Sequence, residues 1–155
     1  MMIRCLLLLW CAALSGGSYG QDQHLPFPVD LSQAHALSLQ QPGAVVILFS
    51  IPDCTYCEQV RAQSLRHLEK DPAYRGHVRV FELDFTDDRR RVVWFDGQQR
   101  TGKAVAQRLD VKFSPTVWVF TPTGGTPAKP LQGAGLPDFY NQYLDELIQQ
   151  VFRSQ

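Results

Sequence analysis

The sequence predicts a single α/β domain, with strands and helices packed in layers around one core. Three observations lead to this prediction. The 155 residues are enough for one hydrophobic core but not for two. Runs that are typical of strands alternate with runs at helical spacing. A two-cysteine motif also lies where the first long strand meets the first long helix, a junction at which α/β proteins often bind ligands.

The first twenty residues are typical of a secretory signal peptide. Arg4 gives a positive start, residues 6–14 form an apolar run, and small residues follow. The run is too short to span a bilayer, although an uncleaved anchor or a buried strand is the alternative. Ser18 and Gly20 precede a possible cleavage point, so we expect a mature chain that starts at Gln21. This pattern predicts export, and in a bacterium the periplasm.

Export would leave two of the four cysteines in the mature chain. Cys5 and Cys11 lie in the expected signal peptide, whereas Cys54 and Cys57 lie in the domain. A framework of structural disulfides is therefore excluded. In an oxidising compartment the remaining pair is either permanently bonded or cycling between two redox states. The balanced charge of the sequence offers no basic surface for nucleic acid, and a monomer is expected.

Residues 21–29 are expected to form an extended lead-in, because the segment carries two prolines that cannot lie inside a helix. The domain is predicted to span 30–155. It begins with a helical extension from Asp30, which can cap a helix, to about Gln40.

The domain then continues with a strand over 44–49, whose continuous apolar run is typical of burial on both faces. A helix is predicted over 54–70. Its inward face is expected to consist of Cys57, Val60, Ser64 and Leu68. The later elements are a strand over 77–84, a helix over 103–109, a strand over 116–120, an edge strand over 129–132 and a helix from Pro137. The last helix carries an apolar stripe that is expected in the core: Phe139, Tyr140, Tyr143, Leu144, Leu147, Ile148 and Val151.

The motif Cys54-Thr55-Tyr56-Cys57 carries the chemistry. At the start of a helix, unpaired backbone N–H groups point at the Cys54 sulfur and favour its thiolate, which is the nucleophile. Cys57 lies one turn further along the same side, so a disulfide between the two can form and break reversibly. Cys54 is predicted to attack a partner and Cys57 to resolve the mixed disulfide, with no cofactor beyond this redox-active disulfide.

Half of a zinc site has the same two-cysteine spacing. Zinc would need two more ligands, and the four histidines include no closely spaced pair: His24, His35, His67 and His77. No metal site is therefore expected.

Further residues make the chain resemble thioredoxin-like proteins over about 44–151. They are the aliphatic strand before the motif, the segment Phe113-Ser114-Pro115-Thr116 before a strand, and Gly124-Gly125 after it. The resemblance implies a thioredoxin fold, an α/β fold with a central mixed sheet flanked by helices, in which Pro115 is cis and faces the motif. It also implies that the backbone at Ser114 binds a substrate segment, beside Thr55 and Tyr56. A trans proline at the start of an edge strand is the alternative.

The chain departs from typical thioredoxins at the position six residues before Cys54. Leu48 stands there in place of a buried carboxylate. We hypothesise that Asp53 or Glu58, which flank the motif, assists proton transfer at Cys57. The alternative is a helix cap and a surface charge. Asp53 would also oppose a thiolate at Cys54.

A second departure is Thr55-Tyr56, because a tyrosine before the second cysteine is more similar to periplasmic disulfide isomerases and glutaredoxins. A third is the long segment from Phe85 to Gly102 before the third helix, which resembles an insertion in bacterial periplasmic thioredoxin-like proteins, including those of sulfur oxidation. Its aromatic residues are expected to cover the core. Alternatively, Trp94 and Phe95 dock a partner.

Together these features predict an exported thiol-disulfide oxidoreductase that acts on protein disulfides, as a reductase supplied with electrons by a membrane thiol shuttle. An oxidase or an isomerase is the alternative within this class. A different class is a non-catalytic metal-binding or interaction module, of which copper delivery is the best version.

Overall fold

The computed structural model describes residues 24–38, 41–135 and 137–155. The expected signal peptide, residues 1–20, and the predicted end of the first helix at Gln40 lie outside these residues. Over 24–29 the lead-in contains neither helix nor strand, as its prolines predict.

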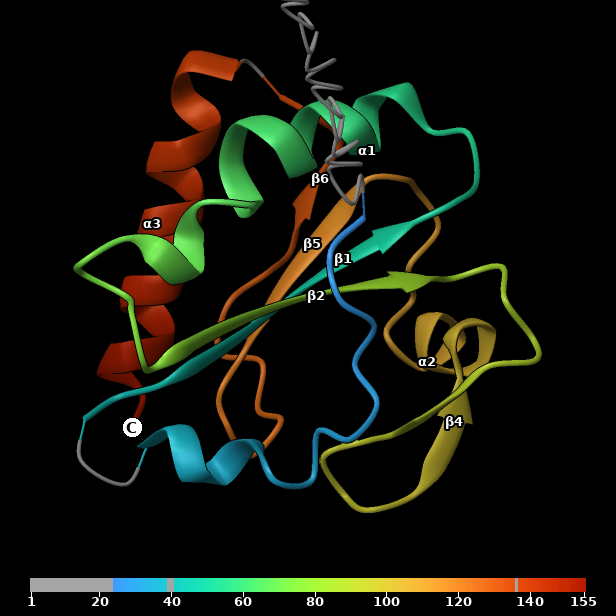
Figure 1. Ribbon diagram of the computed structural model, residues 1–155, viewed down its shortest axis with the longest axis horizontal. Helices are drawn as coiled ribbons and strands as arrows, with labels where there is room; N and C mark the ends of the chain where they lie inside the picture. The colour runs from blue at the N-terminus through green and yellow to red at the C-terminus, as the bar shows by residue number, and fades with distance from the viewer. Residues whose placement is uncertain (1–23, 39–40, 136) are drawn as a thin grey trace, which may run out of the picture.

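A four-stranded mixed sheet forms the centre of the molecule (Figure 1), in the order β2-β1-β5-β6. Strand β1 (Ala44–Ser50) pairs in parallel with β2 (Val78–Asp84) and antiparallel with β5 (Thr116–Phe120). The short β6 (Leu131–Gln132) is antiparallel to β5. Every residue of β1 is buried, as the continuous apolar run predicted. The predicted fold class is confirmed.

Two layers of helices and loops cover the sheet. The helical elements are η1 (Ala34–Ser38), α1 (Thr55–Val60), η2 (Arg61–Leu65), η3 (Leu68–Lys70), α2 (Gly102–Arg108) and α3 (Pro137–Arg153). Alternate residues of β1 face opposite layers: Val46 and Leu48 pack in the core beneath α1 and α3, and Ile47 and Phe49 pack in the core beneath α2. Figure 1 shows α1 and α3 away from α2 and the strands around it.

The helix predicted over 54–70 is not one regular α-helix. Its middle, η2, is a π-helix, in which the N–H of Arg66 donates to the carbonyl of Arg61, five residues back. The wider turn brings Leu65 into the core and leaves Ser64 partly exposed, so the prediction for Ser64 is wrong. The other three residues of the predicted inward face are buried. The same turn buries Arg61, and nothing in the helical periodicity predicts this burial.

The N-terminal extension is shorter and tighter than predicted over its described part. The element found there is the 3-10 helix η1, and Asp30 instead closes a turn by accepting hydrogen bonds from the N–H and hydroxyl of Ser32. The last helix also differs in detail, because Phe139 and Tyr143 of its apolar stripe are about half exposed. The stripe is wider than the helix face that the sheet covers.

The insertion between β2 and α2 forms a hairpin of β3 (Arg91–Val93) and β4 (Gln99–Thr101). Trp94 follows β3 and is 7% exposed. Its ring meets Phe95 and Phe120 edge-on, with ring centres 5.0 and 5.5 Å apart. The expectation that these aromatic residues cover the core is confirmed for Trp94, and the docking alternative is wrong for that residue.

Replacing Trp94 with alanine should destabilise the protein by about 3–5 kcal/mol, because a large buried side chain leaves a cavity. Tyr143→Ala is the control, since this aromatic side chain is half exposed and its loss should cost less than about 1 kcal/mol. Urea denaturation measures both free energies of unfolding. Equal losses in the two variants would contradict the assignment of Trp94 to the core.

Candidate active site

Cys54 and Cys57 lie at the start of α1 and form a disulfide with a Cα–Cα distance of 5.2 Å. Cys54 caps the helix with an extended backbone, and its sulfur accepts a hydrogen bond of 3.1 Å from the N–H of Cys57. Cys54 is partly exposed, whereas Cys57 is completely buried. A partner can therefore reach the first sulfur but not the second.

The loop before β5 lies against this disulfide. The peptide bond between Ser114 and Pro115 is cis, the conformation that the resemblance implied. Pairing of Phe49 with Thr116 places the start of β5 beside the end of β1, from which the motif continues. The Ser114 hydroxyl lies 2.9 Å from the sulfur of Cys57 and 3.5 Å from that of Cys54.

Exposed side chains surround the disulfide on the outside. Thr55 and Tyr56 are exposed, as suits the substrate-binding role predicted for them, which stays a prediction. Phe113, next to Ser114, is 62% exposed, and Ile51 before the motif is exposed too. Neither Phe113 nor Ile51 is among the predicted site residues, although each lies within three residues of one.

A buried ion pair lies behind the motif. Leu48 is fully buried and pairs in register with Glu82 of β2. The guanidinium of Arg61 donates two hydrogen bonds to the Glu82 carboxylate, at 2.9 and 2.7 Å, and both residues are buried. This ion pair is not predicted from the sequence, although the alternation of Glu82 with Val78 and Val80 indicates an inward side chain.

Three segments meet at the Glu82 carboxylate. Besides Arg61, the N–H of Leu25 in the lead-in donates to it at 3.1 Å. Burial alone would raise the pKa of Glu82, but hydrogen bonds from Arg61, from Ser50 at the end of β1 and from Leu25 outweigh burial and hold this pKa below its ordinary value. Glu82 is therefore an ionised carboxylate that ties the lead-in, β1 and the motif helix together.

The two carboxylates proposed for proton transfer lie beside Cys54. Asp53, Glu58 and Arg61 line a hollow of about 440 Å³ with Cys54. Glu58 forms ion pairs with Arg61 and Arg66. Among the described residues neither Asp53 nor Glu58 hydrogen bonds to the sulfur of Cys57. Their role in proton transfer stays a prediction.

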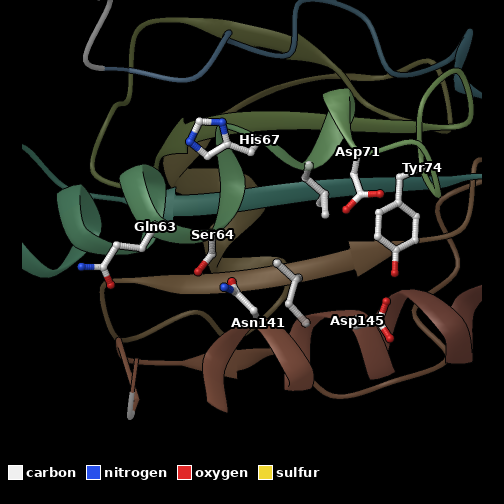
Figure 2. A pocket seen from close by; sticks show the side chains of 9 residues that line it. Gln63, Ser64, His67, Asp71, Tyr74, Asn141 and Asp145 are labelled. Atoms are coloured by element: carbon white, nitrogen blue, oxygen red, sulfur yellow. The ribbon is translucent and has the colours of Figure 1, made fainter. Parts of the chain in front are cut away.

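A separate hollow of about 260 Å³ lies between α3 and the segment from η2 to η3 (Figure 2). Figure 2 shows the side chains of Gln63, Ser64 and His67 on one side and those of Asn141 and Asp145 on the other. Its lining contains neither cysteine of the motif and no residue of the cis-proline loop. It is therefore separate from the candidate active site.

The described part of the chain holds no cluster of three or more acidic, histidine or cysteine side chains suited to a metal ion. Within the same residues, no helix has the length and apolar character needed to cross a membrane.

Comparison with known proteins gives a match to a family model described as a thioredoxin-like domain, over residues 29–148. The oxidized mitochondrial thioredoxin 3 of Saccharomyces cerevisiae is 18% identical, with a TM-score of 0.51, over 79% of this chain and 95% of that one. The periplasmic thioredoxin SoxS of Paracoccus pantotrophus is 20% identical, with a TM-score of 0.46, over 69% and 97%. No curated protein matches. At these identities the solved structures show the fold alone.

Replacing Glu82 with glutamine should destabilise the protein at pH 7 by about 1–3 kcal/mol, because the buried Arg61 loses its hydrogen bonds to a charged carboxylate and keeps only the partly exposed Glu58 as an ion-pair partner. The pKa of Glu82 is lowered in the folded state, so its contribution to stability is present above pH 4.5 and is lost as the pH falls through the folded pKa. The variant should therefore lose less stability than the original protein on acidification. Urea denaturation at pH 7 and at pH 3.5 tests this, with the exposed Glu146→Gln as control.

Proposed function

The chain belongs to the thioredoxin-like family and is a thiol:disulfide oxidoreductase, and from this premise we propose that it is an exported reductase of protein disulfides. The observation that carries the proposal is the disulfide itself, with Cys54 reachable and Cys57 buried against the cis-proline loop. In the proposed reaction the Cys54 thiolate attacks a substrate disulfide, and Cys57 then displaces the substrate sulfur from Cys54.

The charges around Cys54 support the reductive direction. Asp53 and Glu58 line the hollow beside this sulfur. Arg61 also lines it, but its guanidinium is already paired with Glu58 and with the buried Glu82. These two carboxylates oppose a thiolate at Cys54, against the backbone N–H of Cys57 that favours one, and so favour the disulfide over the reduced protein. A pair that prefers the disulfide gives its electrons readily to other disulfides.

The exposed side chains around the motif support protein substrates. Tyr56, Phe113 and Ile51 offer apolar surface next to Cys54, which suits contact with a polypeptide that carries the target disulfide. In the proposal, electrons come from a membrane thiol shuttle, because the resemblance to periplasmic members of the family implies one.

The direction is tested by equilibrating the Cys54–Cys57 pair with glutathione. We expect a reduction potential near about −270 mV, as for thioredoxin, whereas a value near about −120 mV would indicate an oxidase. Asp53→Asn should raise the reduction potential by less than about 30 mV, which corresponds to less than a tenfold change in the equilibrium with glutathione. Asp145→Asn, far from the motif, should leave the potential unchanged.

The protein should also accelerate insulin reduction by dithiothreitol, and Cys54→Ser should abolish the acceleration.

Export is tested by expressing the full chain in a bacterium and sequencing the N-terminus of the protein from the periplasmic fraction. Residues 1–20 form the pattern of a signal peptide, so the recovered chain should begin at Gln21. Replacing two leucines of the apolar run with aspartate should keep the protein in the cytoplasm, because the run then no longer enters the export machinery. Unprocessed protein in the cytoplasm in both cases would refute export.

A further inference from the structure

The hydroxyl of Ser114 makes the polar contact between the cis-proline loop and both sulfurs. In the disulfide neither sulfur carries a hydrogen, so Ser114 must be the donor in these contacts. A hydroxyl has one hydrogen to give. The sulfur of Cys57, at 2.9 Å, is the nearer acceptor, and that of Cys54 is 3.5 Å away.

The sulfur of Cys57 needs such a partner more than the sulfur of Cys54 does. Cys57 is completely buried, so water cannot solvate a thiolate at this position, and a buried charge without a hydrogen bond is costly. Cys54 is partly exposed and has the N–H of Cys57 as a donor. Leu48, on the strand beneath, offers only an apolar side chain.

Among the described residues, no carboxylate hydrogen bonds to the sulfur of Cys57. Glu82 is committed to Arg61, Ser50 and Leu25, and its pKa is held low, so it carries no proton near neutral pH. Glu58 is committed to Arg61. The hydroxyl of Ser114 is in contact with this sulfur, and it can both give a hydrogen bond to the Cys57 thiolate and accept one from its thiol.

We propose that Ser114 is a catalytic residue of the exchange reaction, in which its hydroxyl stabilises the Cys57 thiolate and relays the proton of the Cys57 thiol. This role belongs to the side chain and is separate from the backbone contact with substrate that the resemblance implies. It rests on disulfide exchange at Cys54–Cys57 but not on the direction of electron flow or on export.

In the reduction of the protein, a donor thiolate attacks the sulfur of Cys54, and a new S–S bond forms as the bond to Cys57 breaks. The electron pair of the broken bond moves to the sulfur of Cys57, where the Ser114 O–H donates to it. In the resolving step, the Cys57 thiol attacks Cys54 of the mixed disulfide. Its proton passes to the Ser114 oxygen, the Ser114 proton passes to the departing substrate sulfur, and the substrate leaves as a thiol.

The test compares Ser114→Thr with Ser114→Val, two side chains of nearly equal shape of which only threonine has a hydroxyl. Stopped-flow measurement follows reduction of the disulfide by dithiothreitol, in a background with Cys5 and Cys11 replaced by serine. We expect the valine variant to react about 10- to 100-fold more slowly than the original protein, as for loss of a hydrogen bond to a charged group, and the threonine variant to recover most of the rate. The equilibrium with glutathione should shift about tenfold toward the disulfide in the valine variant, about 30 mV.

Thr116→Val is the matched control, because it removes a hydroxyl on the other side of Pro115 that bonds to the carbonyl of Phe113 and not to sulfur. It should lower stability but leave the rate of disulfide reduction within about twofold of the original.

A direct measurement follows ionisation of the Cys57 thiol by ultraviolet absorbance in a Cys54→Ser background. There Ser114→Val should move the ionisation of Cys57 to higher pH. Equal reduction rates for Ser114→Thr and Ser114→Val would overturn the proposal. So would a Thr116→Val variant that is slowed as much as Ser114→Val. If the original protein failed to accelerate insulin reduction, that result would instead count against disulfide exchange itself.

Discussion

Strand β1 has no exposed residue, and this burial determines where the reactive sulfurs can lie. A strand buried on both faces and paired along both edges leaves only its ends free. Its C-terminal end meets the end of the parallel β2 and the start of the antiparallel β5. The Cys54–Cys57 motif follows the C-terminal end of β1, Glu82 lies near the end of β2, and Ser114 precedes β5. Strand pairing alone therefore brings three segments together that are distant in the sequence.

The Arg61–Glu82 ion pair fixes how the motif helix sits on this sheet edge. Removing two charges from water is costly, and the pair persists because Ser50 and the N–H of Leu25 complete the hydrogen bonds of the carboxylate. The π-helical turn is part of the same arrangement, since it turns Arg61 inward. The lead-in is thus part of the wall behind the active site and not a loose extension of the domain.

Local patterns were enough to predict the parts of the fold that depend on local chemistry. The apolar run of β1 and the spacing of the cysteines indicated the correct elements, whereas the cis conformation of Pro115 followed from the resemblance to thioredoxin-like proteins. Hydrophobic periodicity assumes a regular helix, so it failed where the π-helical turn replaces Ser64 with Leu65. The ion pair and the sulfur–hydroxyl contacts join residues 21 and about 60 positions apart, and a pattern in one segment cannot specify them.

With Leu48 on the strand beneath the motif, two tasks that one buried carboxylate could combine fall to different side chains. A carboxylate lies behind the motif on the neighbouring strand, where Glu82 pairs in register with Leu48 and is held by Arg61. Because the pKa of Glu82 is held low, this group can anchor the helix but cannot take up and release a proton near neutral pH. Anchoring therefore falls to a charged pair, and contact with the buried sulfur falls to a neutral hydroxyl on the opposite side of the site. A hydroxyl adds no negative charge beside Cys57, so it stabilises the thiolate without the repulsion that a second carboxylate would bring.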